Sequence, residues 1–108
     1  MLIQVKLNYK KIFLSKIRGN YAFLKNIIII IKNTQDKILY VDYTKSRLGD
    51  YSPPIILKNM TYYYEVAEIS EEQVDYIECI AKAVEDKMHP IFKNKRLECK
   101  KDVTVIID

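Results

Sequence analysis

The stretch that decides the fold runs from Ile27 to Thr44 and reads IIIIIKNTQDKILYVDYT. Its five consecutive isoleucines are apolar and β-branched, which is typical of a strand buried on both faces of a sheet. A polar turn at 33–37 follows, and 37–44 has the alternating side chains of a second strand. The alternation predicts two faces, with Ile38, Tyr40 and Asp42 on one and Leu39, Val41 and Tyr43 on the other. We therefore predict a β-hairpin whose first strand lies at the centre of the sheet.

Strand signals also occur near both ends of the chain and in the segment before residue 70. Residues 2–8 alternate between apolar and polar side chains. Residues 61–68 also have the character of a strand, with one face formed by Tyr63, Glu65 and Ala67 and the other by Tyr62, Tyr64 and Val66. In 96–107 the apolar side chains keep period two, either as one strand or as two short strands broken near Lys101. Each of these segments is predicted to form strand structure, and residues 2–8 a strand with one buried face.

The segment between the first strand and the isoleucines is predicted to be helical. Apolar side chains recur at spacings of four, four and three from Phe13 to Leu24, which is the pattern of a helical stripe. We expect a helix over at least 9–18. Gly19 and Asn20 then either end this helix or turn a hairpin.

A second and clearer helix is predicted after residue 70. Ser70 and Gln73 have the spacing of a capping box, and Pro90 cannot continue a helix and ends it. The apolar face of this helix is wider than one stripe because further apolar side chains adjoin it, namely Tyr76, Cys79 and Ala83. Such extra width suits either a second packing surface within the chain or a homodimer contact through this helix.

The order of elements predicts an α+β fold. Strand, helix, strand, strand, extra strand, helix and strand contain the βαββαβ pattern of ferredoxin-like proteins. We expect one domain over 1–108, with a ferredoxin-like core, one extra antiparallel strand and two helices packed on one face of the sheet. This fold hosts many unrelated functions, so it predicts an architecture and no activity.

Composition restricts the chemistry that the chain can perform. The 108 residues include one His, two Gly and two Cys. One His and two well-separated cysteines, Cys79 and Cys99, do not supply a zinc site, and two glycines do not supply a phosphate-binding loop. No apolar run reaches the length of a membrane span, and the first residues lack the apolar core of a signal peptide. We expect a cytoplasmic protein with free thiols, no metal, no cofactor and no catalytic site.

The charges are unevenly distributed along the chain. Lys and Arg number 18 against 14 Asp and Glu, which gives a net charge of +4. No acid occurs before Asp36, whereas 65–89 is strongly acidic and 93–101 is basic again. Such separation can steer an anionic partner toward the chain or favour head-to-tail self-association. The predicted partner-binding residues are Lys10, Lys11, Arg18, Lys25, Lys93, Lys95 and Arg96.

Tyrosines near basic side chains indicate a second kind of surface. Tyrosines exposed on a sheet can stack with unpaired bases while cations contact the phosphates. The candidate nucleic-acid-binding residues are Tyr40, Tyr43, Tyr63, Lys45 and Arg47. Asp42 is expected beside Tyr40 on the same face, where it would repel phosphate.

The sequence thus favours a non-catalytic binding protein that engages a protein or nucleoprotein complex through a basic surface. The chain has 17 Ile, 15 Lys, nine Tyr and six Asn, whose codons are AT-rich, and this indicates an AT-rich coding sequence. This coding bias, the small size and the lack of enzyme motifs suggest a phage or mobile-element inhibitor of host defence, similar in kind to an anti-CRISPR protein, in the host cytoplasm. Three alternatives stay open: a single-stranded nucleic-acid-binding module, a small metal-independent nuclease, and a subunit that self-associates.

Overall fold

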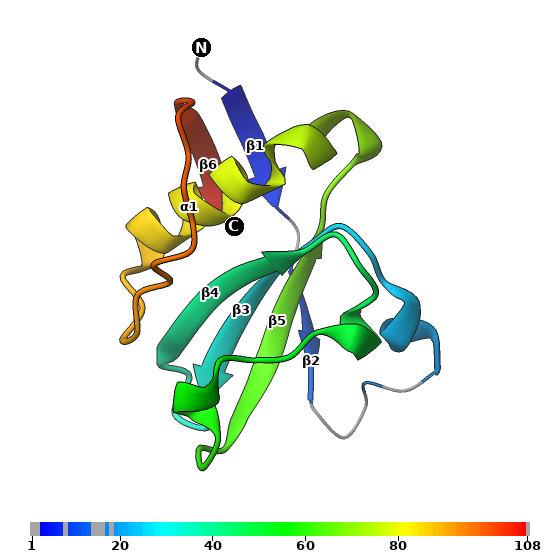
Figure 1. Ribbon diagram of the computed structural model, residues 1–108, viewed down its shortest axis with the longest axis vertical. Helices are drawn as coiled ribbons and strands as arrows, with labels where there is room; N and C mark the ends of the chain where they lie inside the picture. The colour runs from blue at the N-terminus through cyan, green and yellow to red at the C-terminus, as the bar shows by residue number, and fades with distance from the viewer. Residues whose placement is uncertain (1–2, 8, 14–16, 18, 108) are drawn as a thin grey trace.

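The computed structural model describes residues 3–7, 9–13, 17 and 19–107. A four-stranded antiparallel sheet in the order β2-β5-β3-β4 forms the body of the molecule (Figure 1). Its strands are β2 (Tyr9–Ile12), β3 (Ile27–Asn33), β4 (Ile38–Thr44) and β5 (Tyr62–Glu68). The isoleucine strand β3 pairs with β4 on one side and β5 on the other. The predicted hairpin and the central place of its first strand are therefore confirmed.

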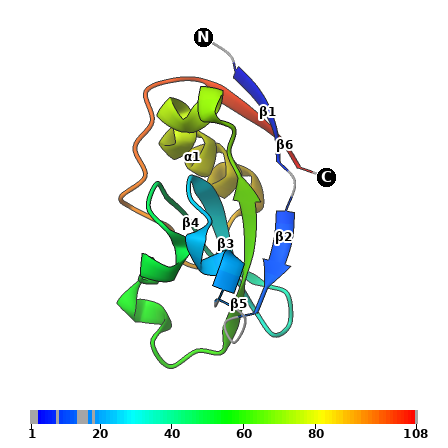
Figure 2. The same cartoon turned by 90° about the vertical axis from the view of Figure 1, so that its right-hand side faces the viewer.

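A second, two-stranded sheet joins the two ends of the chain. In it β1 (Ile3–Leu7) runs parallel to β6 (Val103–Ile107). Helix α1 (Ile77–Met88) packs against β3 and β4 and also against β6, so it lies next to both sheets (Figures 1 and 2). The helix is preceded by the 3-10 turns η5 (Glu71–Tyr76).

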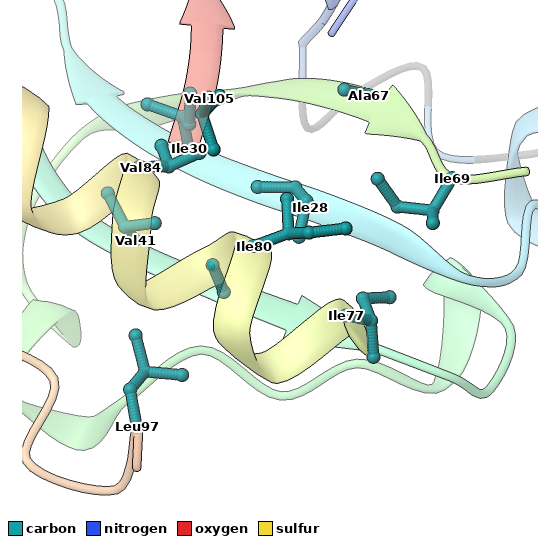
Figure 3. Close-up of a cluster of buried hydrophobic side chains, with 11 residues drawn as sticks. Ile28, Ile30, Val41, Ala67, Ile69, Ile77, Ile80, Val84, Leu97 and Val105 are labelled. Carbon is teal, nitrogen blue, oxygen red and sulfur yellow. The ribbon is translucent and has the colours of Figure 1, made fainter. Parts of the chain in front are cut away.

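Both faces of the four-stranded sheet are covered, as the isoleucine run requires. One face carries Ile28 and Ile30, which pack with α1 and with Val105 of β6 (Figure 3). The other face carries Ile27, Ile29 and Ile31, which are covered by irregular segments and by two short 3-10 helices, η3 (Leu48–Asp50) and η4 (Ile55–Leu57). A further 3-10 helix, η2 (Gly19–Phe23), contacts η3. All five isoleucines have exposed fractions of 0%.

The α+β class is confirmed, but the ferredoxin-like arrangement is not what the described residues form. Residues 9–12 are the edge strand β2, so the helix expected over 9–18 is wrong at its start. Its remainder includes residues 14–16 and 18, which lie outside the described residues. Within the described part of the chain α1 is the one α-helix. The first and last strands pair with each other in a separate sheet, whereas a ferredoxin-like fold would place them in the main one.

Two local expectations are also corrected. The register of β3 with β4 shifts between Ile31 and Lys32, so Leu39 is an extra residue on β4. Ile38 therefore packs on the α1 side, opposite to Tyr40, although strict alternation had placed them together. Ser70 makes no side-chain capping bond, because the first turns after it are 3-10 rather than α-helical.

Helix α1 ends where Pro90 requires it to end. Met88 is its last residue, and His89 adopts the left-handed conformation at φ 51°. The N–H of His89 still donates to the carbonyl of Glu85 at 3.0 Å, which closes the last turn. The chain then turns back toward β4.

Candidate functional site

The chain that leaves α1 runs beside β4 and carries three of the candidate cations, Lys93, Lys95 and Arg96. Backbone hydrogen bonds hold it there: Ile91 donates to the carbonyl of Ile38 at 3.0 Å, and Phe92 to that of Leu39 at 2.9 Å. This segment therefore occupies part of the edge of β4. The three cations extend from a fixed backbone along that edge.

A buried polar pair fixes the middle of the same segment. Glu85 of α1 is 2% exposed, and its Oε2 accepts a 2.7 Å hydrogen bond from the backbone N–H of Asn94. The side-chain amide of Asn94 donates to the carbonyl of Val41 at 3.1 Å, and its Oδ1 accepts from the N–H of Arg96. Lys82 provides the charge partner of Glu85 at 3.2 Å. Asn94 thus links helix α1, strand β4 and the backbone N–H of Arg96.

Two hollows meet at Arg96, and together we call them the Arg96 groove. The polar hollow has a volume of about 520 Å³, and its lining includes Thr44, Lys45, Ser46, Ser52 and Arg96. The apolar hollow has a volume of about 440 Å³ and is lined by Tyr40, Pro54, Ile56, Ile91, Phe92, Lys93, Asn94, Lys95 and Arg96. Predicted residues from both sets, Tyr40, Tyr43, Lys45 and the three C-terminal cations, therefore lie around one surface depression.

The floor of the polar hollow is organised around Asp42. This carboxylate is 6% exposed and accepts hydrogen bonds from the Tyr51 hydroxyl at 2.8 Å and the Tyr43 N–H at 2.8 Å. The guanidinium of Arg96 lies 3.4 Å from its Oδ2. Burial, followed by the charge of Asp42, raises the pKa of Tyr51 above its ordinary value. The sequence predicts that Asp42 repels anions, but Arg96 compensates its charge and the Tyr51 hydroxyl donates a hydrogen bond to it.

Arg96 is held on one side and open on the other. The Tyr40 hydroxyl and then the Asp42 carboxylate raise the pKa of its guanidinium, which stays charged at any physiological pH. Its side chain nevertheless remains 73% exposed. Its other N–H groups are therefore available to an anionic ligand.

The remaining cations of the groove are free to act on a ligand. Among the residues that the structure describes, no ion pair involves Lys45, Lys93 or Lys95. Arg47, another candidate, lies close by but pairs with Asp50 at 3.1 Å and covers the ring of Phe23. The groove therefore has an excess of positive charge to which Arg47 adds little.

The N-terminal cations are placed elsewhere. Lys10 and Lys11 lie on β2, at the edge of the sheet opposite to β4, and Lys25 precedes β3. Lys11 covers the ring of Tyr63 at 4.5 Å and lies 4.0 Å from Asp36. Arg18 is outside the described residues. The structure thus divides the predicted basic surface into two parts, and Tyr63 belongs to the second part.

The candidate tyrosines are less accessible than base stacking requires. Tyr40 and Tyr63 are each 5% exposed, so their rings are part of the core. Tyr43 is half-buried and packs against the cluster under α1.

Several residues of the site were not identified from the sequence. Ile56 and Ile91 line the apolar hollow and are 52% and 58% exposed, and no periodic pattern distinguishes them from core isoleucines. Glu85 did leave a signal, because it follows Ala81 by four residues and so extends the core-facing stripe of the helix. A carboxylate at such a position requires a buried partner.

The two cysteines form a disulfide, so the prediction of free thiols is wrong. Cys79 of α1 and Cys99 are joined with a Cα–Cα distance of 4.9 Å. Lys101 of the same segment covers the ring of Tyr76 at 4.4 Å. The extra apolar side chains of the helix therefore make contacts within the chain. They no longer favour a homodimer contact through this helix.

No known protein family, characterised protein or solved structure matches this chain. Within the described residues, no helix has the length and apolar character needed to cross a membrane. The same residues contain no group of three or more His, Cys, Asp or Glu side chains arranged to hold a metal ion.

Proposed function

We propose that this chain is a non-catalytic binding protein that engages a macromolecular partner at the Arg96 groove. The observation that carries the proposal is the fixed position of Lys93, Lys95 and Arg96 beside an exposed apolar hollow. Their backbone is held by Glu85 and by β4, so little conformational freedom is lost when a partner binds. Unpaired cations at the rim also accelerate the encounter with an acidic partner.

The alternative of single-stranded nucleic-acid binding has weaker support. Stacking requires an accessible aromatic face, and the rings of Tyr40 and Tyr63 are buried. The cations of the groove would still attract phosphate groups. Capture of a nucleic acid is therefore one outcome of the test.

The biological role that the small size and the coding bias favour is that of an inhibitor of host defence encoded by a phage or mobile element. A surface that captures one partner without chemistry suits such a role. The proposed location in the host cytoplasm is less favoured by the disulfide, because such bonds persist mainly in oxidising compartments.

The test compares the two groups of cations with each other. One variant carries Lys93→Glu and Lys95→Glu, and the matched control carries Lys10→Glu and Lys25→Glu, which changes the net charge equally. Each protein is immobilised and exposed to host lysate, with and without nuclease treatment. The proposal expects a captured partner that survives nuclease, is lost with the first variant and is retained by the control. Equal retention by both variants would refute the groove as the binding surface.

A further inference from the structure

We infer that the Arg96 groove takes an acidic segment of a partner protein, with a carboxylate on Arg96 and an adjacent apolar side chain in the apolar hollow. The inference rests on the proposed function and names the class of partner. It follows from three features of the groove: its apolar walls, the orientation of Arg96, and the prior occupation of β4.

The apolar hollow needs an apolar occupant. Ile56 and Ile91 expose about half of their surfaces there, and Phe92 and Pro54 complete the walls. Large aliphatic side chains exposed next to an arginine are typical of the centres of protein interfaces, where apolar anchors enter pockets. A nucleic acid presents charged phosphates and polar base edges, and its aliphatic groups, such as the methyl group of thymine, are smaller than a Leu or Ile side chain and fill such a hollow less completely.

Arg96 supplies the charged half of the recognition. Its Nη2 is held 3.4 Å from the Oδ2 of Asp42, so the side chain is oriented before any ligand arrives. An oriented guanidinium can form two parallel hydrogen bonds with one carboxylate. Lys93 and Lys95 flank the hollow and favour further acidic residues in the same segment.

The partner is recognised through side chains, because the edge of β4 is already in use. The carbonyls of Ile38 and Leu39 accept hydrogen bonds from the backbone N–H groups of Ile91 and Phe92, and the carbonyl of Val41 accepts one from the side-chain amide of Asn94. A partner strand cannot add to the sheet at these positions. Specificity therefore depends on the pairing of a carboxylate with an apolar side chain.

The experiment selects dodecapeptides from a random display library on the immobilised full-length protein. The inference expects enriched peptides in which Asp or Glu adjoins Leu, Ile, Phe or Trp. The most enriched peptide is then synthesised with a fluorescein label and titrated by anisotropy. Selection of peptides without acidic bias, or selection of none, would overturn the inference.

Variants identify the surface that the peptide uses. Arg96→Gln and the double variant Ile56→Ser, Ile91→Ser are each expected to weaken binding by about tenfold or more, the loss typical of a central interface residue. Lys10→Gln and Ile106→Ser are matched controls on other surfaces and should change affinity by less than about twofold. Equal losses in the controls would overturn the inference.

One competitor separates this inference from the broader proposal. An oligothymidylate of similar charge should displace the peptide only weakly. If it instead binds more tightly than the peptide and loses affinity in the Arg96→Gln protein, the groove is a binding surface but its partner is a nucleic acid. If neither probe responds to the groove variants, both proposals fail.

Discussion

The Oε2 atom of Glu85 lies 2.7 Å from the backbone nitrogen of Asn94, at the point where the segment after α1 turns along β4. The carboxylate is 2% exposed, and Lys82 balances its charge at 3.2 Å. Burying a carboxylate is unfavourable unless charge and hydrogen-bond partners are both present, and here both are. This pair ties the geometry of the Arg96 groove to the packing of the helix.

Replacing Glu85 with Ala should therefore destabilise the protein and the groove together. The N–H of Asn94 loses its acceptor in a buried place, which costs about 1–3 kcal/mol of unfolding free energy. Urea denaturation measures that loss. Hydrogen exchange of residues 92–97 should accelerate more than that of β3, because the segment is released locally.

Glu85→Gln is the control for this change. Its amide oxygen can still accept from Asn94, so it should lose less stability than Glu85→Ala although it removes the charge facing Lys82. If the two variants were equally unstable, the ion pair with Lys82 would matter more than the bond to Asn94.

Truncating a buried isoleucine of β3 should lower the unfolding free energy more than the change at Glu85. Ile29 is fully buried in the cluster on the face of the sheet opposite to α1. Ile29→Ala should lower the unfolding free energy by about 2–5 kcal/mol, as expected for a large-to-small change in a core. Ile106, which is 44% exposed, provides the control, and Ile106→Ala should change it by less than about 1 kcal/mol. Thermal unfolding followed by circular dichroism compares the two.

The hairpin was predictable from the sequence because its signal is local. Five β-branched residues, a polar turn and an alternating strand specify adjacent partners, and short-range pairing needs no knowledge of the rest of the chain. The edge strand β2 was not predictable in the same way. Residues 9–12 pair with β5, more than fifty positions later, and the helical spacing that begins at Phe13 has no such long-range information.

The groove was likewise only partly predictable, because its residues come from distant segments of the chain. The cations at 93–96 were identified because charge is visible in the sequence, but their separation from Lys10 and Lys11 depends on strand order. The apolar hollow is assembled from η4, the segment after α1 and β4, so no single stretch contains it. The disulfide joins residues 20 apart whose proximity depends on how the chain returns past the helix.

Alkaline pH should destabilise the protein through its buried tyrosines. Burial raises the pKa of Tyr51 above its ordinary value of 10.0 in the folded state only. Below pH 10 the unfolded chain keeps its hydroxyl protonated and this contribution to stability is fully present. As the pH rises above 10, the unfolded state releases the proton, and the free energy of unfolding falls until the pH reaches the folded-state pKa. Urea midpoints measured between pH 8 and 11 should therefore decline.

Tyr51→Phe isolates this contribution, because it removes the titrating hydroxyl that donates to Asp42. The variant should be less stable at neutral pH, yet its stability should decline less steeply above pH 10. Tyr21, whose side chain is 43% exposed, supplies the comparison, and Tyr21→Phe should keep the wild-type decline. A wild-type decline in Tyr51→Phe would show that other groups dominate the alkaline transition.

The disulfide should stabilise the fold, because it attaches to α1 the segment that leads from the groove to β6. Closing a loop of this length restricts the unfolded chain and stabilises the fold by about 3 kcal/mol in the loop-entropy account. Addition of a phosphine reductant should lower the melting temperature of the wild type. Serine replacement of both Cys79 and Cys99 should lower it similarly and remove any response to the reductant. Hydrogen exchange should accelerate most in 98–107, because this segment loses a covalent attachment to α1. The contacts that remain for β6 are its pairing with β1, the packing of Val105 and the hydrogen bond from Lys87 to the Val105 carbonyl. A wild-type melting temperature that ignores the reductant while free thiols appear would contradict this stabilising role.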